Sequence, residues 1–219
     1  MENSSATANV LFVAYGGYTA TEAGAKNWAL ALAAKHGWRH VVAVSGPHNV
    51  LYKDHEKLAA NTSLLKDIIP SVKPDRIIIA AHSSGTFVAH EFMDLLIKAK
   101  LPALAAKISY YDIDGSSCLS CMKLAKAQPQ DSAKSGFVYR CISATQKSGP
   151  ASANYETMKS CGPDFFRELD AKDTQCSGKW CMHGWLVNHR AAVFGQVSPS
   201  IPGYYEDPQI LPCDEFLDK

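Results

Sequence analysis

Short apolar runs alternate along the chain with longer segments in which apolar residues recur at helical spacing. The runs are continuous rather than alternating, which is typical of strands that are buried on both faces of a sheet. They predict strands at residues 10–15, 40–45, 76–81, 108–111 and 137–143, and a shorter strand at 179–182. Helical patterns fall at residues 56–69, 86–100 and 185–196, and a further helix is expected between a cap at Thr19 or Thr21 and a stop at Gly37.

The order of these elements indicates the fold class. Strands that are each followed by a helix predict an α/β protein with a three-layer, mostly parallel sheet, covered on both faces through right-handed crossovers. No internal repeat or Gly/Ser linker divides the chain, and the polar stretches 115–136 and 144–178 are expected to be irregular insertions over one edge. The 219 residues are therefore expected to form a single domain, 1–219. In such a sheet, ligands bind at the carboxyl ends of the strands.

Charge and hydropathy exclude several classes of partner. The chain has 22 Lys and Arg against 21 Asp and Glu and no run of five like charges, so no nucleic-acid partner is expected. No apolar window approaches the roughly 18 residues of a membrane span, so no integral membrane association is expected. The first apolar run is too short for a signal peptide and lacks a basic flank. If Met1 is the native start, the expected location is cytoplasmic.

The cysteines favour a different compartment. Cys141 lies in an apolar run and is expected to be buried, whereas six others lie among Ser, Gly, Pro and Lys: Cys118, Cys121, Cys161, Cys176, Cys181 and Cys213. Six cysteines allow three disulfides in fifteen pairings, and disulfides would imply an extracytoplasmic location. A zinc site is disfavoured because the pair at 176 and 181 has four intervening residues. Sequons at Asn3 and Asn61 fit secretion but do not decide it.

Ser83 is the candidate nucleophile. It follows the most apolar run and precedes a helix, and a sharp strand-to-helix turn strains its central residue and needs small residues two positions before and after it. Around Ser83 those positions hold Ala81 and Gly85, whereas around Ser84 they hold bulky residues. A Ser-rich helix cap is the alternative interpretation.

A serine hydroxyl needs a base, and the base needs a third group that orients it. Asp112 ends the predicted fourth strand and is the candidate acid, with Asp114 in reserve. Asp114 is also explained as part of a turn with Gly115. His183 is the candidate base because it follows the predicted sixth strand in a loop, whereas His189 falls inside the final helix and is disfavoured.

The oxyanion that forms when a serine attacks a carbonyl needs fixed N–H donors. Two are available, the amide of Ser84 at the start of a helix and the amide of Gly17 in the turn after the first strand. Neither a dinucleotide-binding nor a P-loop motif is present at that turn, so a nucleotide site is disfavoured. His82 is expected to face away from Ser83, with a structural or substrate-facing role.

Together these residues resemble the α/β-hydrolase fold, in particular its small lipases and esterases. The resemblance rests on the turn 15–17, the elbow 81–85, an acid after a strand and a late histidine. The segment 107–112 is similar to the acid-bearing segment of animal triglyceride lipases, and 181–183 is similar to their Cys-x-His segment, whose Cys is disulfide-bonded. Ala81 stands where the elbow usually has Gly. The resemblance implies a compact α/β-hydrolase fold without a large cap domain.

These inferences predict a serine hydrolase that cleaves a carboxylic ester, with a small-molecule or lipid-like ester as substrate and without cofactor or metal. Ser83 attacks, His183 transfers the proton, Asp112 orients His183, and the amides of Gly17 and Ser84 hold the oxyanion. A lactonase, thioesterase or acyltransferase would use the same triad. A non-catalytic binding protein of the hydrolase fold and a flavodoxin-like or Rossmann domain are further alternatives, and the sequence leaves the oligomeric state open.

Overall fold

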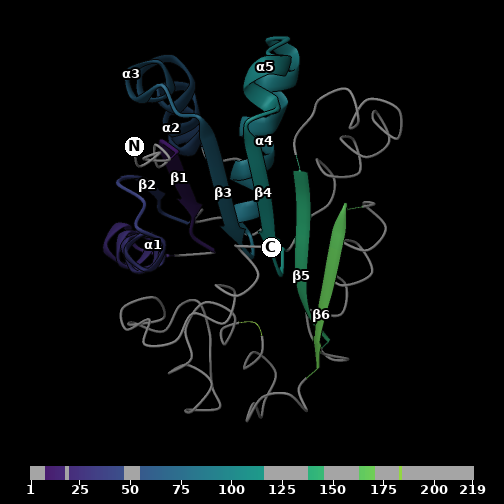
Figure 1. Ribbon diagram of the computed structural model, residues 1–219. Helices are drawn as coiled ribbons and strands as arrows, with labels where there is room; N and C mark the ends of the chain where they lie inside the picture. The colour runs from purple at the N-terminus through teal and green to yellow at the C-terminus, as the bar shows by residue number, and fades with distance from the viewer. Residues whose placement is uncertain are drawn as a thin grey trace, which may run out of the picture.

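The computed structural model describes the sheet and the helices that cover it. The described residues are 8–17, 20–46, 55–115, 138–145, 163–170 and His183. Within them six strands form one sheet in the order β2-β1-β3-β4-β5-β6, and every neighbouring pair is parallel (Figure 1). The strands are β1 (Val10–Tyr15), β2 (His40–Val44), β3 (Arg76–His82), β4 (Ile108–Ile113), β5 (Val138–Thr145) and β6 (Phe165–Asp170).

Helices cover both faces of this sheet. They are α1 (Glu22–His36), α2 (His55–Ser63), α3 (Ile69–Val72), α4 (Gly85–Lys98) and α5 (Pro102–Ala105), with a π-helical segment η1 (Leu64–Ile68) between α2 and α3. The step from β1 to β2 and the step from β3 to β4 run in opposite directions across the sheet. Because parallel crossovers are right-handed, α1 and α4 lie on opposite faces. Helix α2 packs against α4 and therefore shares its face.

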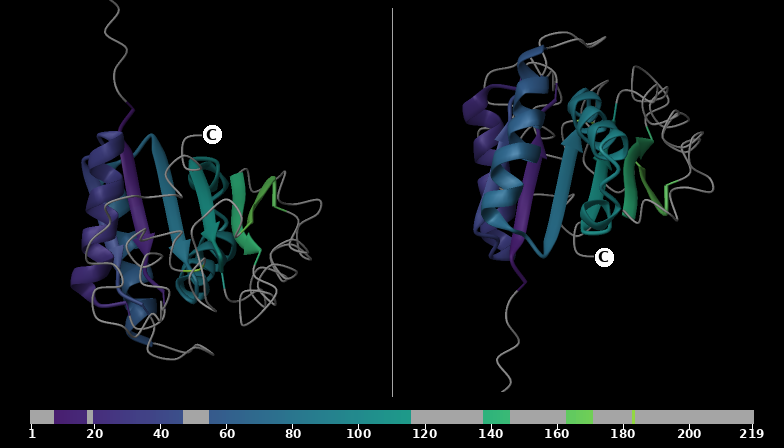
Figure 2. Two further views of the ribbon diagram at one scale, coloured as in Figure 1. Left: turned by 90° about the horizontal axis from the view of Figure 1, so that it is seen from below. Right: turned by 90° about the horizontal axis from the view of Figure 1, so that it is seen from above.

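Alternating strand residues fill the two faces. On the α4 side, one buried cluster contains Leu11, Val13, Tyr15, Ile77, Ile79, Phe92 and Leu96. The intervening residues Phe12 and Ala14 are also buried and point to the other face, where α1 buries Trp28. Helices on both faces of a sheet make three layers, and in both views of Figure 2 the strands from β1 to β6 follow one another across the middle layer. The predicted α/β fold class is confirmed.

Helix α1 begins and ends at residues that the sequence marks. The Thr21 side chain accepts a hydrogen bond from the Gly24 amide at 3.0 Å, which caps the first turn. Gly37 has φ 69°, a left-handed conformation that glycine adopts without steric cost, and it ends the helix. Among the helices in the described ranges, none combines the length and the apolar character that crossing a membrane would require.

The structure differs from the sequence-based prediction at β6. This strand, Phe165–Asp170, lies inside the stretch 144–178, which was expected to be irregular, so that expectation is wrong. It carries charged residues and exposes 52% of Phe165, whereas the other strands were recognised by continuous apolar runs. Among the described strands β6 pairs with β5 alone, and an edge strand needs no such run. The predicted strand 179–182 and helix 185–196 lie outside the described residues.

Asn61 joins three elements at the carboxyl side of the sheet. Its Oδ1 accepts a hydrogen bond from the Tyr15 hydroxyl at 2.8 Å, and its Nδ2 donates to the carbonyl oxygen of Val88 at 2.7 Å. The side chain is fully buried, so its amide nitrogen is already used inside the fold. Asn61 therefore does not act as a glycan acceptor in the folded protein, although it begins a sequon.

Candidate active site

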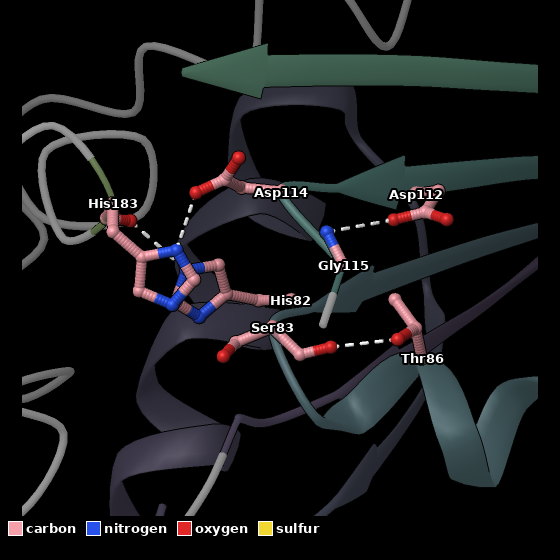
Figure 3. Close-up of polar contacts among 7 residues, drawn as sticks. All are labelled: His82, Ser83, Thr86, Asp112, Asp114, Gly115 and His183. Carbon is pink, nitrogen blue, oxygen red and sulfur yellow. Dashed lines mark hydrogen bonds and ion pairs between the residues drawn. The ribbon is translucent and has the colours of Figure 1, made fainter. Parts of the chain in front are cut away.

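Ser83 lies on a strained turn between β3 and α4. Its φ is 54°, a left-handed conformation that is costly for a residue with a side chain. Two contacts hold the turn: the Ser83 amide donates to the carbonyl oxygen of Ile113 at 3.0 Å, and the Thr86 hydroxyl donates to the Ser83 carbonyl oxygen at 2.7 Å (Figure 3). The predicted elbow geometry is therefore present, with 6% of Ser83 exposed.

Gly85 brings the end of β1 against this turn. A Cβ at Gly85 would lie 2.4 Å from the carbonyl oxygen of Gly16 and 2.6 Å from that of Tyr15, so only glycine fits at this position. The turn that contains Gly17 therefore lies beside the N-terminus of α4. The Ser84 amide precedes α4, at the end of the helix where backbone N–H groups have no intrahelical acceptor and the dipole is positive.

His183 and Asp114 form a buried pair beside Ser83. The Nδ1 atom of His183 lies 2.5 Å from Oδ2 of Asp114, and both side chains are almost completely buried. A carboxylate accepts hydrogen bonds, so Nδ1 carries the proton and Nε2 is the nitrogen that can take up another. Asp114 follows β4 and has φ 47°, a conformation that turns its side chain from the strand toward His183.

Ser83 and His183 do not share a hydrogen bond in the described structure. In Figure 3 the Ser83 side chain extends to the side on which the His183 ring lies. Within the described residues, Ser83 Oγ makes no hydrogen bond to Nε2 of that ring. Catalytic hydrogen bonds between a serine and its base are often long before substrate binds.

The contact that the sequence predicts for Asp112 is made by Asp114 instead. Asp112 points to the α4 face of β4, where its Oδ1 accepts from the Gly115 amide at 3.0 Å and its Oδ2 accepts from the Tyr139 hydroxyl at 3.0 Å. Strand β4 extends to Ile113, two residues beyond its predicted end, so Asp112 is inside the strand rather than at the sheet edge. The expected contact between Asp112 and His183 is therefore a wrong prediction.

Burial changes the protonation of Asp112. Removal from water raises the pKa of its carboxyl to about 7, and the nearby Asp114 carboxylate also raises it. The hydrogen bonds from Tyr139 and Gly115 act in the opposite direction and are weaker in effect. At neutral pH, Asp112 thus carries only part of a negative charge.

His82 makes contacts that sequence reasoning missed. Its Nε2 lies 3.0 Å from the carbonyl oxygen of His183, and the two imidazole rings have centroids 4.6 Å apart. Burial lowers the pKa of His82 well below its ordinary value, and the neighbouring His183 lowers it further. The position of His82 at the end of the most apolar strand could have indicated such a contact, because a buried imidazole needs a polar partner.

Some predicted features fall outside the described residues. These include His189 and the cysteines of the proposed disulfides and of the disfavoured zinc site, whereas Cys141 is buried as predicted. In the described ranges, no group of three or more His, Cys, Asp or Glu side chains is arranged to hold a metal ion.

Comparison of the sequence with models of known families and with curated proteins finds no match. An uncharacterized protein from Bacillus cereus ATCC 10987 superposes with a TM-score of 0.51 at 11% identity, covering 78% of this chain and 55% of that one. Phospholipase PlaB from Legionella pneumophila gives a TM-score of 0.44 at 11% identity, covering 63% and 39%. The RedJ thioesterase from Streptomyces coelicolor gives 0.42 at 12% identity, covering 75% and 78%.

The chain spans 39% of the length of the phospholipase and 55% of the length of the Bacillus cereus protein. At these identities the likeness concerns the fold alone. A strained serine on a strand-to-helix turn, followed along the chain by an acid and a histidine, is the arrangement on which the predicted resemblance to α/β-hydrolases rests. The comparisons support the predicted α/β fold with a parallel sheet.

Proposed function

We propose that this protein is a serine hydrolase that cleaves carboxylic esters through an acyl-enzyme on Ser83. The observation that carries the proposal is the buried His183–Asp114 pair beside a serine in a strained elbow. A strained conformation at a buried polar residue is costly, and such strain is concentrated at functional sites. An imidazole with a carboxylate on Nδ1 is the arrangement that makes a neighbouring serine nucleophilic.

In the proposed reaction, Ser83 Oγ attacks the ester carbonyl carbon while its proton passes to Nε2 of His183. Asp114 orients the ring and stabilises the imidazolium that forms. The ester C–O bond then breaks, and His183 returns the proton to the leaving alkoxide. Water, deprotonated by His183, attacks the acyl-enzyme and releases the carboxylic acid and free Ser83. The sum is ester and water to acid and alcohol.

The amides of Ser84 and Gly17 are the proposed donors to the oxyanion. Ser84 stands at the positive end of α4, and the close approach of Gly85 to Gly16 supports a location of both amides beside Ser83. Loss of one such donor typically costs about 100-fold to 1,000-fold in kcat. Thioesters and lactones carry a carbonyl carbon that a serine can attack in the same way. A panel of substrates that differ in acyl group and leaving group is therefore needed to distinguish these activities.

The direct test is hydrolysis of p-nitrophenyl esters of increasing acyl length by the wild type and by Ser83→Ala. We expect hydrolysis by the wild type and a loss of at least about 1,000-fold in kcat/KM in the variant, with an unchanged circular dichroism spectrum. Ser71→Ala is the matched control, because Ser71 is an exposed serine of α3, before the start of β3, whereas the elbow follows the other end of that strand. Full activity in Ser83→Ala would reject the assignment.

A further inference from the structure

His82 holds the main chain of His183 by a hydrogen bond whose direction is fixed by chemistry. A carbonyl oxygen only accepts, so the 3.0 Å contact requires a proton on Nε2 of His82. His82 is fully buried at the end of β3, and it pairs in register with Ile113 of β4. The donor, Nε2–H of His82, therefore belongs to a strand of the sheet, whereas His183 comes after β6 in the chain.

The same imidazole also lies against the ring of His183. The two ring planes are inclined by 35°, with centroids 4.6 Å apart (Figure 3). Asp114 holds Nδ1 of His183 at 2.5 Å, so His183 is fixed by Asp114 and at two points by His82. These contacts restrict both the position of the His183 backbone and the rotation of its ring.

The protonation state of His82 suits this arrangement. Burial and the proximity of His183 lower the pKa of His82, so His82 stays neutral when His183 takes up a proton. A second cation at this distance would oppose the imidazolium that general-base catalysis creates.

His82 is the last residue of β3, and Ser83 follows it directly in the turn. We infer that His82 is a positioning residue that fixes His183 relative to the neighbouring Ser83, through its Nε2–H bond to the His183 carbonyl oxygen and its ring contact. This inference rests on the proposed function of Ser83 and His183. Through these contacts His82 aligns the base with the serine, which a residue that only fills space in the core would not do.

The experiment compares side chains at position 82 that place a hydrogen-bond donor at different distances from the backbone. His82→Gln places an amide N–H near the position of Nε2, whereas His82→Asn carries the same amide on a shorter side chain, and His82→Leu has no donor. The readouts are kcat and KM for p-nitrophenyl acetate and the rate at which a fluorophosphonate modifies Ser83. His90→Gln is the matched control, because His90 is an equally buried histidine that contacts Tyr110 at 2.8 Å.

We expect His82→Asn and His82→Leu to lower kcat and the labelling rate by about 10-fold to 100-fold with little change in KM, and His82→Gln to recover most of the loss. His90→Gln should lower the melting temperature without changing either rate. The Gln and Asn pair keeps the test usable if the Leu variant does not fold.

Two results would overturn the inference: wild-type labelling rates in folded His82→Asn, or equal losses in the Gln and Asn variants. A wild type whose Ser83 is not labelled would instead reject the proposed function itself. The two failures are therefore distinguishable.

Discussion

At the scale of single residues, two neighbouring aspartates have different surroundings. Asp114 stands beyond the end of β4 and contacts His183, whereas Asp112 is inside the strand and contacts Gly115 and Tyr139. A carboxylate that orients a catalytic histidine must be ionised and must reach Nδ1. In the proposed mechanism Asp114 has that role, and Asp112 supports the turn in which Asp114 lies.

This difference predicts unequal effects of two identical substitutions. Asp114→Asn should lower kcat for p-nitrophenyl acetate by about 1,000-fold to 10,000-fold, because an amide on Nδ1 favours the wrong tautomer of His183. Asp112→Asn keeps an acceptor for the Gly115 amide and should remain within about tenfold of the wild type. Steady-state kinetics of the two variants provide the measurement, and a larger loss in Asp112→Asn would return the orienting role to Asp112.

The buried carboxyl of Asp112 also predicts a pH dependence of stability. Its pKa is about 7 in the folded chain against an ordinary value of 3.8, so folding favours the protonated form. The contribution of this carboxyl to the free energy of unfolding is fully present below about pH 4 and is lost as the pH rises through 7. Relative to the wild type, Asp112→Asn should therefore gain stability across this window, by up to about 1.4 kcal/mol per pH unit. Urea unfolding of both proteins between pH 4 and 8 measures the difference, and a constant difference would contradict the prediction.

Part of the site could be identified from residue types and spacing. Ser83 was identifiable because the sizes of Ala81 and Gly85 are a local requirement of the elbow. The choice between Asp112 and Asp114 depends on where β4 ends and where the distant residue His183 lies, and local patterns carry neither. The contact of His82 with His183 is likewise a tertiary contact, across 101 residues of sequence.

At the scale of elements, the elbow depends on close packing between β1 and α4. Gly85 permits it, because any Cβ there would overlap the carbonyl oxygens of Gly16 and Tyr15. The Tyr15 oxygen belongs to the central strand β1 and the Gly16 oxygen to the residue that follows it, so neither backbone atom can move aside easily.

Gly85→Ala should therefore destabilise the fold by about 3 kcal/mol or more and reduce activity, since the turn after β1 must shift. Gly37→Ala is the control: Gly37 has φ 69° but no atom lies within 4 Å of an added Cβ. It should cost about 1–2 kcal/mol in backbone strain and leave kcat unchanged. Thermal unfolding and kinetics of both variants test the pair, and equal behaviour would show that the contact with β1 is unimportant.

Most elements could be predicted because buried parallel strands leave continuous apolar runs. The first five strands were recognised in this way, with ends that differ from the predicted ends by up to two residues. Strand β6 was missed because its charged residues interrupt the apolar run. It is held in the sheet by backbone hydrogen bonds to β5, which do not depend on an apolar sequence. The Asn61 contacts were also beyond prediction, since they depend on three elements meeting.

At the scale of the whole molecule, the strand order brings the proposed catalytic groups together. The chain leaves β1 toward β2 and leaves β3 toward β4, so β1 and β3 flank a topological switch point. Ligands of open α/β sheets bind at such a point, at the carboxyl ends of the strands. Gly17 follows β1, Ser83 follows β3, Asp114 follows β4, and His183 comes later, after β6. A parallel sheet predicts this convergence, but the neighbours of each strand were not evident from the sequence.

Labelling with a fluorophosphonate probe, followed by peptide mapping, shows directly whether Ser83 is an activated nucleophile. An activated serine displaces fluoride and forms an Oγ–P bond, and an ordinary buried serine does not react. We expect modification of the wild type at Ser83, none in Ser83→Ala, and slow modification in Asp114→Asn. A folded wild type that stays unmodified, or that is modified at another serine, would contradict this expectation.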